Sequence, residues 1–441
     1  PTGKNDVFSG LETLLNNSLI RETNPFNDEP KFRMLQTIQE YANMVLEKTG
    51  RMEEFRWAHT SYYADLTNDE LGMVTFSGNS DYALKKMDDE QENFRLALDW
   101  SLTHEEGFPL AVMMMVPLSW YWYRYGHLQE GREWTDRALK ISAGLGDSPL
   151  RVMALVGSGY LTLWTGDLIL ATEYSLEALK ISERLKFDEG LALSKLGYGV
   201  TLINRGMDKK AYPHLVDAVE LFDNNEQGWM KSAALVHLAN VSLGMAEFEQ
   251  AIHWLDLAKP LVEENGDIWN KAFIENNYGE VARALGDYEK AEKHYRRTDE
   301  LYKEADARGD QARLVHTFGY IAQHKGEYGK AEDLFKESLK DFLELGNRRG
   351  IAECLAGLAG LAAAQDRQTW AAPLMGSAES QLNAIGGQWW PADRVEIESA
   401  KAKMQKALDN EFDALWEQGK AMGVAEAIEY ANSPSNEMIS K

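Results

Sequence analysis

The 441-residue chain carries 46 Lys and Arg residues against 70 Asp and Glu residues, which gives a formal net charge of −24. A negative net charge disfavours sequence-independent binding to the phosphate backbone of nucleic acids, so nucleic acid is not the expected partner. The length exceeds that of one ordinary hydrophobic core and requires several domains or a linear array of stacked units, while 44% hydrophobic residues and only 11 prolines predict a chain folded nearly throughout.

Cysteine use and hydropathy indicate the compartment. Cys354 is the single cysteine, so no internal disulfide can form, and the N-terminus lacks a basic stretch followed by an apolar signal region. The longest run without charge, residues 108–123, is interrupted by Pro117 and is shorter than the roughly 20 residues that a membrane-spanning helix needs. These features predict a cytoplasmic chain without a membrane span.

The N-terminal residues are predicted to form a small unit of their own. An amphipathic stretch at residues 7–20 precedes a possible two-stranded turn, and the segment Lys31-Phe-Arg-Met-Leu-Gln-Thr-Ile-Gln-Glu-Tyr-Ala42 leads into a helix. We assign residues 1–50 to this unit and residues 51–107 to bridging helices that form an N-terminal cap.

An internal repeat occupies the centre of the chain. Residues 286–291 read Gly-Asp-Tyr-Glu-Lys-Ala, and residues 326–331, 40 positions later, read Gly-Glu-Tyr-Gly-Lys-Ala. Steps of 40 residues reach seven positions where a helix end and a turn are expected: Gly126, Gly166, Gly206, Ala246, Gly286, Gly326 and Asp366. The chain therefore contains about seven units.

Three columns of mostly small residues keep the same register. Seven residues before each turn stand Ser119, Gly159, Gly199, Ala239, Gly279, Gly319 and Ala359. Five residues after each turn stand Gly131, Ala171, Ala211, Ala251, Ala291, Ala331 and Ala371. Twelve residues after each turn stand Ala138, Ala178, Ala218, Ala258, Thr298, Ser338 and Ala378. Close approach of two helices requires small residues of this kind.

Each unit is predicted to be a pair of helices. Apolar residues between the columns recur at helical spacing, and the Gly-Asp/Glu-aromatic step supplies the turn within a pair. The turns between units are expected at Gly146, Gly266, Gly309, Gly346 and Gly386. Because a short pair cannot bury its apolar face alone, stacked pairs share a continuous core and create an extended concave surface.

The Gly-Asp-Tyr-x-Lys-Ala turn and the small-residue columns resemble the tetratricopeptide repeat. This resemblance implies an all-α fold, a right-handed superhelical solenoid of about seven tetratricopeptide-like helix pairs with a 40-residue period, at residues 108–387. The usual tetratricopeptide period is 34 residues, so longer helices or loops are implied, and HEAT or armadillo repeats are the structural alternative. Residues 388–432 are expected to form C-terminal capping helices and residues 433–441 a flexible tail.

Motifs in both flanks resemble the bacterial STAND ATPases, the signal-transduction ATPases with numerous domains. Residues 32–42 are similar to the closing part of the winged-helix domain in that family. Further motifs follow in the family's order at residues 90–100, 123–134 and 373–379, and at Phe412, Trp416 and Gly419. The resemblance implies a winged-helix-like N-terminal remnant and the sensor region of a signal-transduction ATPase or transcriptional regulator.

The chain lacks the Gly-x-x-x-x-Gly-Lys-Ser/Thr phosphate loop of that family. Gly3-Lys4 and Gly329-Lys330 have neither the required earlier glycine nor a following Ser or Thr, so no nucleotide site and no cofactor are expected. Since Pro1 falls inside the winged-helix resemblance, we expect a C-terminal piece of a longer regulator whose ATPase module lies upstream. The alternative is a free-standing solenoid with a helical cap.

Standard catalytic signatures are also absent from the sequence, which has no His-Glu-x-x-His, no Gly-x-Ser-x-Gly, no Cys-x-x-Cys and no calcium loop. Cys354 is expected to pack in the core rather than act as a nucleophile. His316 and His324 lie about two helical turns apart and lack a third ligand nearby, so no metal site is predicted. We therefore do not expect an enzyme.

Candidate binding residues follow from the tetratricopeptide resemblance. In that family the first helix of each pair lines the concave face through positions two, five, nine, twelve and thirteen, with the turn glycine at position fifteen. The resemblance implies the following ligand-binding residues: Trp120, Tyr123, Arg124, Tyr160, Trp164, Asn204, Asn240, Asn276, Glu280, Arg283, Arg313, His316, Tyr320 and His324. The groove is then aromatic at its start, amide-bearing in its middle and mixed charged and polar later.

The asparagines and the first aromatic residues suggest kinds of ligand. Asn204, Asn240 and Asn276 are 36 residues apart, so each lies one helical turn earlier in its unit and the three are expected to form a diagonal ladder. Their amides donate and accept hydrogen bonds, which suits a peptide backbone or the hydroxyls of a sugar, or else neighbouring helices. Trp120 and Tyr123 could stack a sugar or an apolar side chain, or belong to the core.

Three functions remain open at this stage. The first is a non-catalytic sensor domain that binds a peptide, protein or small-molecule effector in the concave groove and signals to the ATPase module. The second is a stand-alone scaffold for protein partners, with no switching role. The third, a nucleic-acid-binding regulator, is motivated by the winged-helix-like start and disfavoured by the negative charge.

Overall fold

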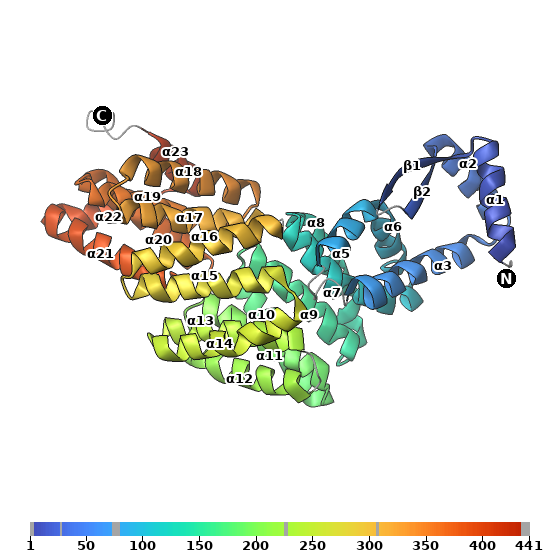
Figure 1. The fold of residues 1–441 in the computed structure, drawn as a ribbon, viewed down its shortest axis with the longest axis horizontal. Helices are drawn as coiled ribbons and strands as arrows, with labels where there is room; N and C mark the ends of the chain where they lie inside the picture. Colours follow the sequence, from blue (N-terminus) through green and yellow to red (C-terminus); the bar gives the residue numbers. More distant parts are fainter. Residues whose placement is uncertain (1–3, 27–28, 73–79, 225–227, 306–307, 434–441) are drawn as a thin grey trace.

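The computed structural model describes residues 4–26, 29–72, 80–224, 228–305 and 308–433, almost all of them helical. Seven antiparallel helix pairs follow one another as a right-handed superhelical solenoid (Figure 1). A small N-terminal unit projects from one end of the solenoid, and three further helices follow its last pair. In the part of the chain described, no helix is both long enough and apolar enough to cross a membrane.

The N-terminal unit contains a β-hairpin between two helices. Its elements are α1 (Lys4–Asn16), β1 (Ile20–Phe26), β2 (Glu29–Met34) and α2 (Gln36–Lys48). The strands pair antiparallel, with Ile20 opposite Met34, so the expected two-stranded turn is present. Among the described side chains of this unit only Ile20 is buried, and Phe8 and Tyr41 are 73% and 65% exposed. The winged-helix assignment of this unit stays a prediction.

Bridging helices connect the N-terminal unit to the solenoid. They are α3 (Met52–Asp65), a π-helical turn η1 (Leu66–Gly72), α5 (Ser80–Asp89), α6 (Gln91–Ser101) and a short 3-10 turn η2 (Glu105–Gly107). Tyr63, Phe94 and Leu98 share one buried cluster with Met114 and Leu118 of the first repeat helix. The bridging helices thus extend the core of the solenoid.

The seven pairs follow the predicted 40-residue register. They are α7 (Phe108–Arg124) with α8 (Leu128–Ser142), α9 (Pro149–Trp164) with α10 (Leu168–Leu185), α11 (Asp188–Asn204) with α12 (Asp208–Asn224), α13 (Gly228–Gly244) with α14 (Phe248–Asn265), α15 (Ile268–Ala284) with α16 (Tyr288–Glu304), α17 (Arg308–His324) with α18 (Tyr328–Glu344), and α19 (Arg348–Ala364) with α20 (Gln368–Ala384). The expected all-α solenoid of helix pairs is therefore confirmed. Gly309 was expected in a turn between units and instead lies within α17, because that helix begins one residue earlier.

The turn within each pair has one left-handed residue. Positive φ angles occur at all seven predicted turn positions, from 60° at Ala246 to 85° at Gly166. In the turns that carry Gly-Asp, the aspartate then caps the second helix: Asp167 accepts from the backbone N–H of Leu170, and Asp287 from that of Lys290. A left-handed residue followed by an N-cap ends one helix and starts the next.

The small-residue columns make room for large neighbours. A Cβ atom at Gly279 would lie 2.5 Å from the ring of Tyr295, and one at Gly319 would lie 2.6 Å from the ring of Phe335. Both rings are fully buried. Glycine in the first helix therefore lets an aromatic ring of the second helix pack against its backbone.

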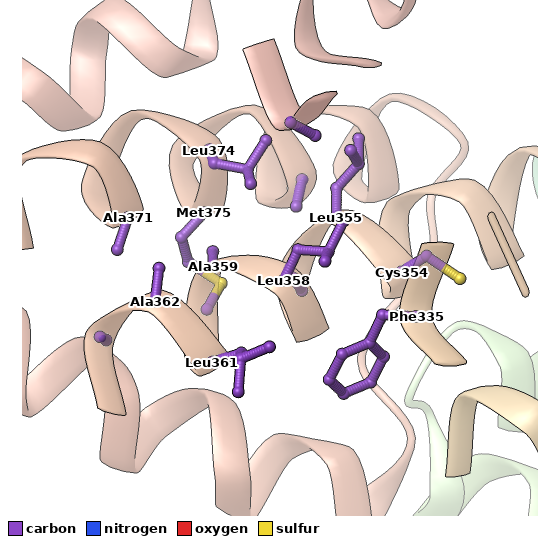
Figure 2. Close-up of a cluster of buried hydrophobic side chains, with 14 of the residues drawn as sticks. Phe335, Cys354, Leu355, Leu358, Ala359, Leu361, Ala362, Ala371, Leu374 and Met375 are labelled. Carbon is purple, nitrogen blue, oxygen red and sulfur yellow. The ribbon is translucent and has the colours of Figure 1, made fainter. Parts of the chain in front are cut away.

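The last repeats share a large buried cluster with the C-terminal helices. Figure 2 shows Phe335, Leu358 and Met375 among small alanine side chains of this buried cluster. Cys354 belongs to the same cluster, and its thiol lies 3.3 Å from the Ser338 hydroxyl. Burial raises the pKa of the Cys354 thiol well above its ordinary value. This is the packed core position expected from the sequence.

The C-terminal helices pack on the last repeats. They are α21 (Pro391–Leu408), a 3-10 turn η4 (Asp409–Glu411), α22 (Phe412–Lys420) and α23 (Val424–Asn432). The α22 helix lies against α20, close enough that a Cβ atom at Gly376 would meet the Trp416 carbonyl oxygen at 2.5 Å. The α21 helix contacts α15, α19 and α20, so it covers part of the concave face in addition to the end of the stack.

The superhelix closes on itself. The Tyr123 hydroxyl of the first pair donates to Asp310 of the sixth pair at 2.8 Å, across 187 residues of sequence. Arg349 of the seventh pair donates to the backbone carbonyl of Asn204 in the third pair at 2.9 Å, and the backbone N–H of Gln388 reaches the same carbonyl at 3.3 Å. These contacts bring early and late repeats together around one cavity on the concave surface.

Candidate ligand-binding cavity

The concave face encloses a cavity of about 1140 Å³. First helices of all seven pairs line it, together with Trp390 and Pro391 at the start of α21. One position contributes in every repeat, thirteen residues before the turn: Met113, Met153, Leu193, Ala233, Phe273, Arg313 and Glu353. The repeat thus determines which side chains face the cavity, and the residue types change along it from apolar to charged.

Nine of the fourteen predicted binding residues line the cavity. They are Trp120, Tyr123, Tyr160, Trp164, Asn204, Asn240, Asn276, Glu280 and Arg313. The structure therefore brings the expected aromatic cluster and the three asparagines to one space. Whether these residues bind a ligand stays a prediction.

The other five predicted residues do not line the cavity. Arg124 is 2% exposed and lies behind the aromatic residues. Arg283, His316 and Tyr320 are buried between the later repeats and α21, and His324 bonds to Glu396 of α21 at 2.9 Å. The family rule assumes a concave face open along its whole length, and α21 occupies that face at α17.

An aromatic cluster forms the part of the wall contributed by α7, α9, α13 and α15. The ring centroids of Trp120 and Trp269 are 4.7 Å apart in a T-shaped contact, and those of Tyr123 and Trp164 are 4.4 Å apart and stacked. Trp229 lies 6.4 Å from Trp120. Four repeats thus present large amphipathic rings to one end of the cavity, which we call the aromatic end.

Two carboxylates bond to the rings of the aromatic end. Asp310 accepts hydrogen bonds from the Tyr123 hydroxyl at 2.8 Å and from the Trp269 indole N–H at 2.7 Å. Asp267 accepts from the Trp229 indole N–H and from the side-chain amide of Asn270. Burial raises the pKa of both aspartates, against the lowering effect of these hydrogen bonds. These hydrogen bonds hold the carboxylates and the indole rings in one orientation.

Polar groups without protein partners lie in the middle of the cavity. Asn204 donates to the Val200 carbonyl and accepts from Arg349, so its amide serves the structure. The side-chain amides of Asn240 and Asn276 have no hydrogen-bond partner within the described part of the chain, and both are half-buried. His237, one turn before Asn240 on α13, also lines the cavity, where burial lowers its pKa to about 4. These three side chains can donate and accept hydrogen bonds with a ligand.

A charged network closes the opposite end of the cavity. The Arg283 guanidinium forms ion pairs with Asp393 at 2.5 Å and with Glu280 at 2.9 Å. The Glu353 carboxylate forms ion pairs with Arg313 at 2.6 Å and with Arg349 at 2.7 Å. The Arg349 and Arg313 guanidiniums lie 4.1 and 5.0 Å from the centre of the Trp390 ring. We call this group with Trp390 the charged end, where cation–π and ionic contacts hold α21 in place.

Several cavity residues were not predicted. His237, Trp229, Trp269, Phe273, Arg349 and Trp390 all line the wall. Trp229, Trp269 and Arg349 stand seventeen residues before their turns, in a helical turn that the 34-residue motif lacks. A search of this extra turn for a recurring column could have found them. Trp390 carries no repeat signal, because its position depends on how α21 docks.

The described residues contain no group of three or more His, Cys, Asp or Glu side chains that could hold a metal ion. Three acidic residues of the cavity, Asp310, Glu280 and Glu353, accept hydrogen bonds from Trp, Tyr and Arg donors. The chemistry that the wall offers is therefore hydrogen bonding, aromatic contact and charge.

Comparisons with known proteins address the fold. No protein-family model matches the chain, and no curated protein matches it in sequence. Among solved structures, a Rap protein complexed with competence and sporulation factor is similar at 13% identity and a TM-score of 0.57, over 86% of this chain and 99% of that one. The Rap conjugation gene regulator of plasmid pLS20, in complex with the Phr* peptide, is 12% identical with a TM-score of 0.49, over 79% of this chain and 97% of that one. The first similarity shows a shared solenoid fold.

Proposed function

We propose that the chain is a non-catalytic sensor domain that binds a peptide in the internal cavity. The observation that carries this proposal is a large cavity on the concave face with aromatic and aliphatic walls and two amides, Asn240 and Asn276, left without protein partners in the described structure. Its volume of about 1140 Å³ exceeds the roughly 300–1,000 Å³ of ordinary small-molecule pockets. A segment of several residues matches this space better than a single metabolite.

The chemistry of the wall matches an extended peptide. A peptide backbone offers an N–H and a carbonyl at almost every residue, and each amide side chain can pair with one of each. Asn240 and Asn276 come from neighbouring first helices and so can hold successive points of one backbone. The apolar residues on α7, α9 and α11 then receive side chains.

A solved structure of the same fold supports this choice of ligand. The similar Rap protein was crystallised in a complex with competence and sporulation factor. That complex concerns the Rap protein, and it supports the idea that a solenoid of this shape accommodates a bound factor. The ligand of the present chain follows from its own cavity residues.

The sensing role rests on the flanking motifs. Residues 32–42 resemble the end of a STAND winged-helix domain, and the N-terminal unit that contains them adjoins the solenoid through the bridging helices. We infer that ligand binding is signalled through these helices to an ATPase module of a longer protein. The stand-alone scaffold is the alternative, and it predicts peptide binding without any change in the N-terminal unit.

Binding of a random hexapeptide library to the full chain tests the proposal. We expect enriched peptides to bind with tryptophan fluorescence changes, because five indoles line the cavity wall. The double variant Asn240→Leu, Asn276→Leu should weaken the enriched peptides at least tenfold, because each lost hydrogen bond is worth about 1 kcal/mol and leaves ligand groups unpaired. The matched control is Asn410→Leu, an exposed position outside the cavity, which should bind like the wild type. Failure to enrich any peptide, or equal loss in the control, contradicts the proposal.

A further inference from the structure

Ionised side chains gather at both ends of the cavity, and the charged end is balanced. Three guanidiniums there face three carboxylates: Arg283, Arg313 and Arg349 against Glu280, Glu353 and Asp393. Oppositely charged groups in direct contact compensate one another even when buried. The charged end therefore needs no charge from a ligand.

The aromatic end has more negative than positive charge. Neither Asp310 nor Asp267 has a cationic side chain within the 4 Å of an ion pair, as far as the chain is described. Arg124 acts on both carboxylates through space from beyond that distance, and its Nε and Nη1 atoms bond to nothing in the described structure. Among the described side chains, two carboxylates thus share one guanidinium, which leaves one negative charge uncompensated.

The uncompensated charge can be reached from the cavity at Asp310. Asp310 is only half-buried and lines the wall, whereas Asp267 is 4% exposed and does not. Each oxygen of Asp310 accepts one hydrogen bond, from Tyr123 or from Trp269, and a carboxylate oxygen can accept a second. A donor that enters the cavity therefore finds free acceptor positions.

The rings around Asp310 favour a cation over a neutral donor. Tryptophan and tyrosine faces attract cations, and a carboxylate held at the edge of these rings adds to the negative potential. Trp120, Trp164 and Trp269 all contribute to the wall here. A half-buried carboxylate without a cation is less well solvated than an exposed one, so a cation that pairs with it is bound more tightly than at an exposed site.

We propose that the aromatic end binds a cationic group of the ligand, with Asp310 as its counter-ion and the rings of Trp120, Trp164 and Trp269 as its walls. The cation is an arginine or lysine side chain, or the ammonium of a peptide N-terminus. This inference rests on the proposed function and names the ligand chemistry that the cavity selects. Burial without an ion pair raises the pKa of Asp310, which is the direction expected of a carboxyl group that lacks its cation.

Two small probes of equal shape test the charge preference. N-acetyl-arginine methylamide and N-acetyl-citrulline methylamide differ by the positive charge, and their binding to the full chain is followed by tryptophan fluorescence. We expect the arginine probe to bind about tenfold more tightly. Asp310→Asn keeps the side-chain shape and one acceptor oxygen but removes the charge, and it should reduce the preference to less than about twofold. Asp333→Asn, on the exposed face of α18, should keep the full preference.

A second variant covers the case in which Asp310→Asn does not fold. Trp164→Leu removes one ring and leaves the carboxylate, and it should lower the preference for arginine about threefold. Equal binding of both probes by the wild type overturns the inference. A tenfold preference that survives in every folded variant of this site overturns it as well.

The source of the cation is distinguished with hexapeptides. Each enriched peptide is made with a free or an acetylated N-terminus and with arginine or citrulline. Acetylation removes the charge of the N-terminal ammonium, and citrulline removes the charge of the side chain, so the loss of affinity shows which cation is bound. Enriched peptides that bind without regard to either charge overturn this inference and leave the proposed function standing. Charge-selective binding of the small probes without binding of any peptide supports the inference and overturns the proposed function.

Discussion

Single residues in the turns show what the repeat requires. Five turns have glycine in the left-handed conformation, whereas Ala246 and Asp366 adopt φ of 60° and 62° with a Cβ atom. The left-handed region costs such a residue about 1 kcal/mol, which the structure tolerates because the bond that closes the turn persists, as from Glu247 N–H to the Ser242 carbonyl at 2.8 Å. The backbone conformation, more than the glycine itself, defines the turn.

A pair of reciprocal variants tests this point. Ala246→Gly should raise the free energy of unfolding by about 0.5 kcal/mol, since relief of strain exceeds the added flexibility of the unfolded chain. Gly286→Ala, at the same place in the next repeat, should lower it by about 1 kcal/mol. No atom lies within 4 Å of a Cβ built at Gly286, so backbone strain alone is measured there. Thermal or urea unfolding gives both values, and effects of the same sign would contradict the explanation.

The residues that line the concave face could be predicted only in part. The 40-residue register, together with the concave positions that the tetratricopeptide resemblance implies, was enough to place Trp120, Asn240 and Asn276 on the cavity wall. It could not show that Arg283 and His316 are covered, because covering depends on a helix from outside the repeats. Nor could it show which amides keep partners, as Asn204 does with Arg349.

Among the elements, α21 departs most from expectation. The sequence indicated capping helices at residues 388–432, and three helices are found there. The start of α21 instead lies on the concave face, where Asp393 joins Arg283 and Arg313, and Trp390 lies beneath Arg349. Helical periodicity identifies an amphipathic helix but does not say where it docks, because docking depends on side chains distant in sequence.

The ion pair of Asp393 should stabilise this docking in a pH-dependent way. Asp393→Asn should lower the free energy of unfolding near pH 7 by about 3 kcal/mol, because it leaves Arg283 buried and without its full charge partner. Burial alone would raise the pKa of Asp393, but Arg283 and Arg313 lower it well below its usual value. The folded pKa is then below the unfolded one, so this contribution is complete above about pH 4 and is lost as the pH falls further.

Thermal unfolding of the wild type and the variant between pH 2.5 and 7 checks this prediction. The difference between them should be largest at neutral pH and should shrink in the acid range. The exposed Asp333→Asn is the matched control and should unfold like the wild type throughout. A difference that grows as the pH falls would show that Asp393 does not stabilise the fold through its charge.

At the scale of the whole molecule, closure of the superhelix shapes the cavity. Seven stacked pairs could leave an open ribbon, but contacts from Tyr123 to Asp310 and from Arg349 to Asn204 join early repeats to late ones. The period predicted the number of pairs and their order. It did not predict closure, because curvature accumulates from small rotations between neighbouring repeats.

The contacts that close the superhelix also have consequences for dynamics. A peptide that touches early and late repeats at once stabilises the contacts between them, so we expect binding and closure to be coupled. A bound peptide should then protect both the cavity wall and the contacts that close it. This coupling offers a route by which an internal ligand changes the bridging helices on α7.

Hydrogen–deuterium exchange of the full chain, with and without the tightest hexapeptide from the library, tests the central claim most directly. The account predicts slower exchange in the first helices α7, α9, α11, α13 and α15, with little change in the second helices α10, α12 and α14 on the convex side. Protection confined to the second helices, or to the N-terminal unit alone, would contradict binding inside the cavity.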